Sequence, residues 1–473
     1  MTDLAATPII NSLRQQAATI LATSLGSATV EPFNTTGLGN FPYTWQDPTN
    51  LRFNQKTYAW IQSGLQEITV ATSPVEQSGI FSNAYNQAIS AISYSYSTAD
   101  QVKVNKGKAQ AEQQQAALLS TWTESGFVLP PGNQPLDGVL NEIQQNWATP
   151  PTSLQAMQST RNLTRLLNKT PASGQNVIPQ LSSWLVAIGS IASLINDGIM
   201  NQGLLTDVQA AVQDPGVTNG GIPLNDANST MMPAWTVSQA VSEIQNSLQN
   251  KGSKIVVAMD VSQASASEFK VSVHGGTGFA IPFLDFFSLG VGASASYFKD
   301  TLTKSGNTVC VKMIWTGPTL VQYEPLPYNQ ATRLGWCYMT PIRDAIKNGT
   351  NADVSGFKFA PDPQIDFGKF GTFGYTTGAA IANYPSVEIT VTSADFKSIE
   401  QTFQQSASST LSFLGIPLAS ATESTYSHST QVDASNSSVT ITLTPPPSLV
   451  ATNGVDAQGW ILGVIVDRPA ATA

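Results

Sequence analysis

The spacing of apolar residues changes once along this chain, close to Lys254. Before that point apolar residues recur at intervals of three and four, as in Leu136, Leu140 and Ile143, which is typical of one helix face. Beyond it apolar and polar residues alternate, as they do over residues 309–316, which is typical of strands with one buried face. The chain is therefore predicted to be α+β, with an N-terminal α-helical bundle followed by a mainly antiparallel β-domain.

The length of 473 residues exceeds that of most single domains, so more than one folding unit is expected. Residues 1–55 begin with a helical pattern from Ile9 to Leu25 and continue with proline, glycine and aromatic residues, which suggests an N-terminal arm. The change of period then separates a helical domain at 56–250 from a β-rich domain at 251–473.

One helical pattern in the first half is long and regular. Apolar residues from Tyr85 to Ala99 follow one another in steps of four and three. This spacing predicts a single long helix that continues through a Gln/Ala-rich run to Trp122.

A second helical segment stands out because it carries no charge between Lys169 and Asp197. A helix that is apolar nearly all round must be buried in protein or in lipid. The Asn196-Asp197-Gly198 tripeptide predicts a break, so the segment would form the first arm of a helical hairpin and be too short to cross a membrane. Core burial is one interpretation; contact with a membrane or a partner is the other, with these candidate residues: Trp184, Leu185, Ile188 and Ile191.

Two segments of the second half resemble each other, residues 269–321 and 396–450. Each begins with Phe-Lys, contains Leu-Gly, and reaches a proline eleven residues after a turn asparagine. We interpret them as a duplicated β-hairpin unit. Between them, Thr340-Pro341 and Gly349 predict one short helix, and residues 459–466 predict a final buried strand.

Each resembling segment contains an apolar lead. The first lead, at 275–298, has Asp285 as its only charge, and its weaker counterpart is residues 411–421. These leads could fill the core of a β-sandwich, or they could leave the fold and meet a bilayer, with Ser/Thr strands lining a polar lumen. The membrane-contacting candidates in the leads are Phe279, Phe283, Phe286, Phe287, Phe413 and Leu414.

The charge balance narrows the choice of partners. The net charge of -9, without a cluster of Lys and Arg, argues against nucleic-acid binding. Only 11% of residues are charged, which suits a surface that packs against copies of itself, so a homo-oligomer is expected. No basic region precedes the first apolar residues, so the sequence predicts a cytoplasmic protein or release by a non-classical route, such as lysis.

No catalytic or cofactor motif is complete. His274-Gly275-Gly276 lacks a Gly-x-Ser-x-Gly partner, and no spacing of metal ligands or phosphate-binding loop occurs. The sequence therefore predicts no enzyme activity, no metal and no cofactor. Cys310 and Cys337 are expected to be free, buried thiols.

These observations support one principal hypothesis, a membrane-interacting, pore-forming, toxin-like protein that oligomerises on a lipid bilayer. The alternative is a self-assembling structural protein, a subunit of a particle or inclusion, without membrane activity. A third possibility, an enzyme or small-ligand binder in the β-rich domain, has no supporting motif.

Overall fold

The computed structural model describes most of the chain. The described residues are 7–24, 30–33, 40–46, 51–67, 74–131, 134–265, 268–273, 279–282, 287–288, 300, 304, 306–406, 412–413, 416–417, 426–446 and 457–470. Over residues 7–12 and 405–406, and over the strands between 263 and 288 and between 412 and 417, the description covers the backbone alone.

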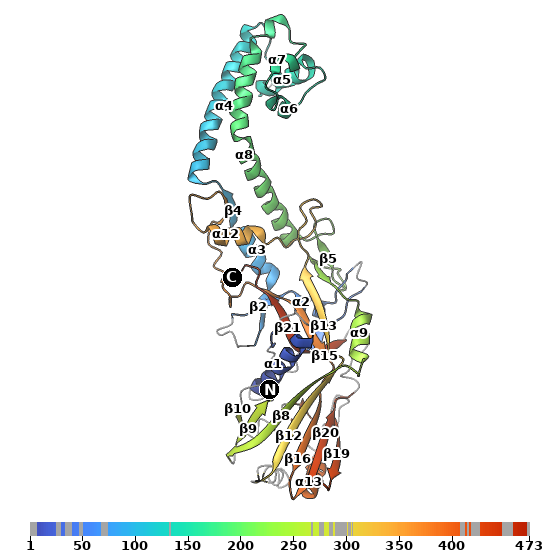
Figure 1. Cartoon of the computed structure of the whole chain (residues 1–473). Coiled ribbons are helices and arrows are strands. Elements are labelled where there is room, and N and C mark those ends of the chain that lie inside the picture. Colours follow the sequence, from blue (N-terminus) through green and yellow to red (C-terminus); the bar gives the residue numbers. More distant parts are fainter. Residues whose placement is uncertain are drawn as a thin grey trace. The chain divides into compact units, whose positions relative to one another are not determined.

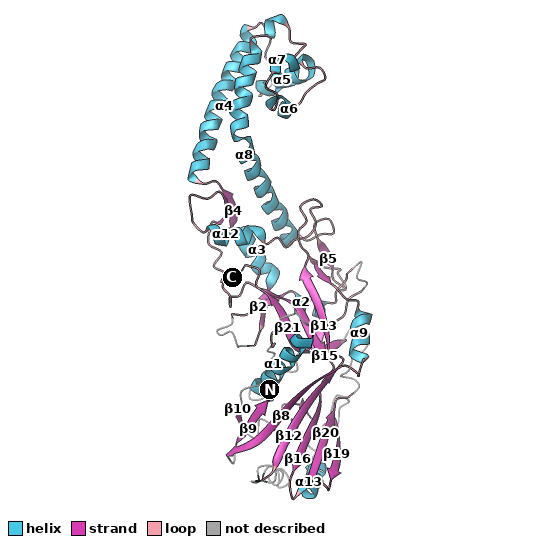
Figure 2. Cartoon of the chain, viewed as in Figure 1, coloured by secondary structure: helices cyan, strands magenta, loops and turns pink. Residues whose placement is uncertain are grey.

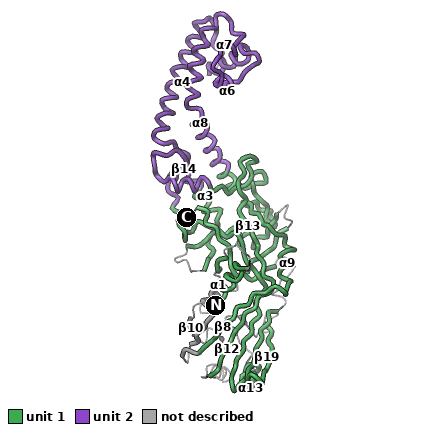
Figure 3. The backbone as a smooth tube through the Cα atoms, in the orientation of Figure 1, with its two compact units in different colours: residues 1–88, 208–339, 364–473 green, residues 89–207, 340–363 purple. Residues whose placement is uncertain are grey.

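The chain forms two compact units built from discontinuous ranges (Figure 3). Unit 1 comprises residues 1–88, 208–339 and 364–473, and unit 2 comprises 89–207 and 340–363. The sequence suggested three consecutive ranges instead, 1–55, 56–250 and 251–473, because local periodicity carries no information on which distant segments return to the same unit.

A first sheet in unit 1 has the order β1-β21-β15-β13-β7, with β2 and β3 added beside β15. Its strands are β1 (Asn40–Pro42), β2 (Ser63–Leu65), β3 (Gln77–Ile80), β7 (Trp235–Val237), β13 (Thr319–Pro325), β15 (Tyr375–Ala382) and β21 (Gln458–Asp467). Aromatic residues pack on this sheet; Phe41, Tyr323 and Trp235 are among those that are buried.

A second antiparallel sheet in unit 1 has the order β10-β9-β8-β12-β16-β20-β19. Its strands are β8 (Lys254–Ser265), β9 (Glu268–Val273), β10 (Phe279–Pro282), β12 (Thr308–Thr316), β16 (Ser386–Thr392), β19 (Ser427–Asp433) and β20 (Ser438–Thr444). A small sheet, β11-β17-β18, consists of β11 (Phe287–Ser288), β17 (Ser412–Phe413) and β18 (Ile416–Pro417).

The two large sheets are joined by continuous chain. Only two residues separate β12 from β13, and Asn383, Tyr384 and Pro385 separate β15 from β16. Asn383 is buried between β15 and β16, and its backbone N–H donates a hydrogen bond to the carbonyl of Thr316, the last residue of β12, at 2.9 Å. The middle strands of the second sheet are therefore anchored at this end of the sheet (Figure 1).

Two helices contribute to the principal core of unit 1. The principal core cluster combines both sheets with α1 (Thr7–Ser24) and α13 (Phe396–Ser406). The helix predicted at 9–25 and the final strand predicted at 459–466 are thus confirmed as α1 and β21. The remaining elements of the unit are α2 (Gln55–Ile61), α3 (Phe81–Ser90, which ends in unit 2), β5 (Gly221–Pro223), β6 (Met231–Pro233) and α9 (Val241–Gln249).

Unit 2 is mainly helical (Figure 2). Its helices are α4 (Thr98–Glu124), α5 (Pro135–Glu142) with a π-helical turn at Ile143–Trp147, α6 (Leu154–Gln158), α7 (Leu163–Leu166), a 3-10 turn at Ala172–Gly174, α12 (Thr340–Asn348), and α8 (Val177–Gln213) up to residue 207. The predicted short helix after Thr340 is confirmed as α12. A two-stranded sheet pairs β4 (Ile92–Ser95) with β14 (Gly356–Phe359).

The prediction of one helix from Tyr85 to Trp122 was wrong. The segment contains α3, strand β4 and α4 in succession. Ile92 fits the helical stripe from Ile89 to Tyr96, but β14 supplies backbone partners that make residues 92–95 a strand. The Ser97 side chain then accepts a hydrogen bond from the Asp100 N–H and starts a new helix at Thr98.

The predicted break at Asn196-Asp197-Gly198 was also wrong, because α8 continues through it to Gln213. Gly198 lies against the Tyr96 hydroxyl, which donates a hydrogen bond to the Leu194 carbonyl at 2.8 Å. Here glycine permits close packing rather than a turn.

The α+β class is consistent with the structure, but the two hairpin units are not confirmed. Phe269-Lys270 lies in strand β9, whereas Phe396-Lys397 begins helix α13. Strand β20 has the hairpin partner β19, but the neighbours of β12 are β8 and β16. The N-terminal helical bundle is not confirmed either, since unit 2 also includes residues 340–363.

Candidate membrane-contacting segments

The four middle strands of the second sheet have one apolar and one polar face. Along β12, the side chains of Val309, Val311, Met313 and Trp315 are buried, while Lys312 is exposed. Strands β16 and β20 repeat this pattern, and the Thr390 and Thr440 hydroxyls lie 3.1 Å apart on the polar face. The predicted alternation is therefore confirmed.

Two long segments are inserted at the same end of these strands. Residues 266–307, the first insert, connect β8 to β12, and residues 393–437, the second insert, connect β16 to β20. The registers pair Val261 with Val309, Thr308 with Thr392, and Thr392 with Ser438. Both inserts therefore begin and end at the same end of the strands, and each joins two antiparallel neighbours.

The inserts also contact each other. Strand β11 of the first pairs with β17 of the second, so that Phe287 lies opposite Phe413 along the backbone. The Lys304 ammonium and the Asp395 carboxylate form an ion pair at 2.6 Å between the same two segments. Because both side chains are substantially exposed, this pair contributes about 1 kcal/mol at most.

Helix α13 attaches the second insert to the sheet. Ile399 and Phe403 are buried in the core of unit 1, and the Phe403 ring lies edge-on to His428 at 5.4 Å. The Thr430 hydroxyl donates to the Glu400 carboxylate at 2.9 Å. At the far end of β19, the buried Tyr426 hydroxyl donates to the Pro385 carbonyl at 3.0 Å.

The predicted phenylalanine candidates fall within these inserts. The structure places the backbone of Phe279 in β10, Phe287 in β11 and Phe413 in β17. The side chains of these three lie outside the description, and Phe283, Phe286 and Leu414 lie outside the described residues. The structure thus brings two candidates, Phe287 and Phe413, to opposite positions of one strand pair.

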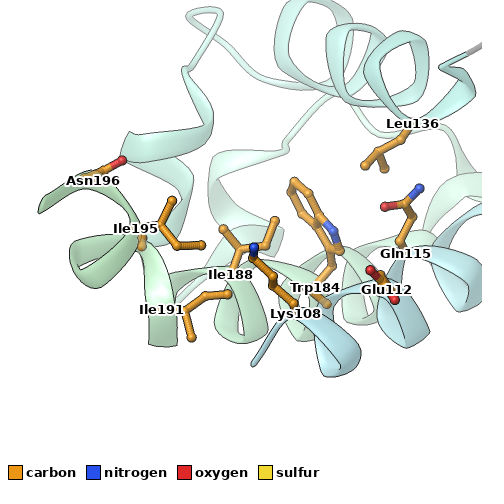
Figure 4. Close-up of a pocket in the computed structure, with 11 residues that line it drawn as sticks. Lys108, Glu112, Gln115, Leu136, Trp184, Ile188, Ile191, Ile195 and Asn196 are labelled. Atoms are coloured by element: carbon orange, nitrogen blue, oxygen red, sulfur yellow. The ribbon is translucent and has the colours of Figure 1, made fainter. Parts of the chain in front are cut away.

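The candidates on α8 lie in unit 2. Trp184, Leu185 and Ile191 are buried, and Ile188 is partly buried against the same core. A groove of about 400 Å³ runs along this helix, with the Trp184 ring on its wall (Figure 4). The groove residues come from α4, α5 and α8 and are Lys108, Ala111, Glu112, Gln115, Leu136, Trp184, Ile188, Ile191, Ala192, Ile195 and Asn196.

Helix α8 is nevertheless not covered all round. It is long and apolar enough to cross a membrane, yet only 33% of its most apolar 18-residue window is buried. Val186, Ile199 and Met200 are exposed. The length and composition of α8 fit a core helix as well as a membrane helix.

The titratable groups near the inserts offer little chemistry. Partial burial, and after it the Asp260 carboxylate, raise the pKa of the Cys310 thiol. Cys310 and Cys337 are not joined by a disulfide, but both are only partly buried, whereas the sequence suggested buried thiols. Among the described residues, no group of three or more His, Cys, Asp and Glu side chains could hold a metal ion.

Sequence reasoning did not identify the ion pair between Lys304 and Asp395, nor that both inserts leave the sheet at the same end of its strands. Lys304 and Asp395 are 91 residues apart, and only the strand order shows that both lie where the inserts leave the sheet. The matching Phe-Lys and Leu-Gly landmarks were a usable signal, because they mark the two inserts.

Comparison with known proteins adds no family. No family model, no curated protein and no solved structure matches this chain.

Proposed function

We propose that this protein is a membrane-interacting, pore-forming protein that oligomerises on a lipid bilayer. The observation that carries the proposal is the position of the two inserts. Each leaves the second sheet at the same end of its strands and joins two antiparallel neighbours, β8 with β12 and β16 with β20.

This position permits a specific rearrangement. A segment that joins two adjacent antiparallel strands at one end can straighten into a hairpin that lengthens both strands. The existing register is preserved, so side chains continue to alternate between the two faces along the new strands. In this proposal both inserts unfold from their present contacts and extend as hairpins into lipid.

The inserts are long enough for this role. A tilted strand crosses a bilayer in about 9–11 residues, so a hairpin with its turn needs roughly 25, whereas each insert has about 40. Their central sequences are also poor in charge. Asp285 is the only charged residue in 279–298, and none occurs in 401–422.

Oligomerisation follows from the same geometry. Two hairpins supply four strands, and an open sheet edge cannot remain exposed to hydrocarbon. Membrane barrels of this kind need at least about eight strands, so several copies must contribute their hairpins to one closed barrel. The low share of charged residues, 11%, reduces repulsion between such copies.

A reversible lock can test the proposal. Ser262 on β8 lies opposite Lys270 on β9, and this pairing must break if the first insert is to straighten. Directly opposed residues on antiparallel strands lie within the distance a disulfide spans. We expect the oxidised Ser262→Cys/Lys270→Cys variant to release no dye from liposomes, and reduction to restore release.

The controls separate locking from damage. Ser262→Cys alone and Lys270→Cys alone should release dye under both conditions, as should the parent with its native cysteines. If the oxidised double variant leaks as fast as the reduced one, the first insert does not extend. Absence of leakage by the parent, together with ordered assembly in lipid-free buffer by light scattering, would instead favour a structural subunit.

A further inference from the structure

A short apolar loop in unit 2, residues Phe127–Pro131, begins two residues after the end of α4. Its sequence is Phe-Val-Leu-Pro-Pro, without any hydrogen-bonding side chain. Val128 is 87% exposed, the largest exposed fraction of any large apolar side chain in the described part of the chain. Leu129 is 37% exposed.

The loop is held in place by packing on both sides of the exposed Val128. The Phe127 ring packs on Trp122 at 4.6 Å and on Trp147 at 5.5 Å, both of which are buried. Pro130 packs on Gly138 of α5, where a Cβ atom would lie 2.4 Å from the proline ring. The exposure of Val128 therefore belongs to the folded loop.

Part of the loop backbone is satisfied within the fold. Trp122 Nε1 donates to the Val128 carbonyl at 3.1 Å, and the Phe127 N–H donates to the Trp122 carbonyl at 3.2 Å. Pro130 and Pro131 have no N–H group. Unsatisfied backbone groups oppose the insertion of a loop into lipid, and these features reduce their number.

We propose that the Phe127–Pro131 loop is an anchor that inserts Val128 and Leu129 into the interface of a lipid bilayer. The proposal rests on the membrane function proposed above and adds the place where unit 2 meets lipid. A protein partner is a poorer match, because protein interfaces combine apolar contacts with about one hydrogen bond per 100–200 Å², and this loop offers no polar side chain.

The chemistry of the anchor predicts which bilayer it binds. The chain carries a net charge of -9, and Glu124 is exposed one turn before the loop. Attraction to anionic headgroups therefore cannot be the driving force, and apolar insertion must be. Vesicles of zwitterionic phosphatidylcholine are the appropriate probe.

The test is co-sedimentation of the full chain with these vesicles. Removing one inserted valine or leucine weakens partition by roughly tenfold or more, so Val128→Ser/Leu129→Ser should bind about a hundredfold more weakly than the parent. Val217→Ser is the matched control, because Val217 is 80% exposed but lies outside the loop. It should bind like the parent, and all three proteins should share one melting temperature.

Measuring binding and dye release on the same samples separates the two proposals. Loop-dependent binding without leakage would support the anchor and contradict pore formation. Leakage by the parent with unchanged binding of the double variant would overturn the anchor and leave pore formation standing. Failure of the parent to bind phosphatidylcholine vesicles would also overturn the anchor, and the loop would then be assigned to a protein partner.

Discussion

The second sheet of unit 1 and helix α8 of unit 2 are both long and apolar, but they differ in how far their apolar surface is covered. Every second residue of β12 from Val309 to Trp315 is buried. In α8, Leu185 is buried while the adjacent Val186 is 71% exposed. The strand places most of its apolar residues on one face, whereas the helix distributes them around its axis.

This difference shows what an uncharged sequence does and does not imply. In the strands, alternation limits the apolar surface to one face, and helices α1 and α13 cover that face. In α8, the contacts with α4 and α5 cover only part of the circumference. Helix α8 therefore leaves apolar surface exposed on the side that α4 and α5 do not cover.

The largest effect is expected at the centre of the covered face. Trp315→Ala should lower the free energy of unfolding by about 3–5 kcal/mol, because it removes a fully buried indole and leaves a cavity. Chemical denaturation monitored by circular dichroism measures the loss. Trp315→Phe, which keeps most of the ring volume, should lose clearly less; an equal loss would show that packing is not the cause.

The second effect concerns helix α13, which covers the same face. Phe403→Ala should cost about 3 kcal/mol, since Phe403 is fully buried between the helix and the sheet. If α13 must leave the sheet before the second insert extends, the same variant should also shorten the lag before dye release. Gln401→Ala, on the exposed side of α13, is the control and should change neither quantity. Lost stability with an unchanged lag would mean that α13 stays docked.

The sequence predicted the covered sheet better than it predicted unit 2. Alternation in residues 309–316 depends only on neighbours along the chain, and that is why strands β8, β12 and β20 could be identified. The pairing of β4 with β14 depends on residues more than 250 positions apart, such as Ser95 and Gly356. Without that pairing, the spacing of Ile89, Ile92 and Tyr96 indicates a helix.

The candidate membrane-contacting segments were predicted only in part from the sequence. The apolar leads were visible in the composition. Their position at the same end of the strands follows from the order of β8, β12, β16 and β20, which only the fold provides. The α8 candidates were chosen for their lack of charge. Burial of Trp184 and exposure of Val186 depend on which side of the helix α4 and α5 occupy, and the sequence does not specify this.

An intermediate effect is expected where α8 contacts α4. A Cβ atom on Gly107 of α4 would lie 2.3 Å from Ile191 Cγ2. Overpacking costs about 1–3 kcal/mol, partly offset by about 1 kcal/mol of better helix propensity, so Gly107→Ala should destabilise by about 1 kcal/mol. Thermal unfolding of the full chain measures the change.

The matched background for this test is Ile191→Leu, which removes Cγ2 but keeps the side-chain volume. There Gly107→Ala should become neutral or stabilising, because the helix propensity remains and the clash does not. Equal destabilisation in both backgrounds would show that the contact between Gly107 and Ile191 does not limit the packing of the two helices.

The smallest effect is expected on the uncovered side of α8, and it tests the comparison most directly. Val186→Ser should change the free energy of unfolding by no more than about 0.5 kcal/mol, as is usual for an exposed position. The neighbouring Leu185→Ser should cost several times more, because Leu185 is buried. If Val186→Ser instead costs over about 1.5 kcal/mol, some other surface must cover this side in solution. Sedimentation velocity would then show whether that surface is a second copy, because the parent would associate at concentrations where Val186→Ser remains a monomer.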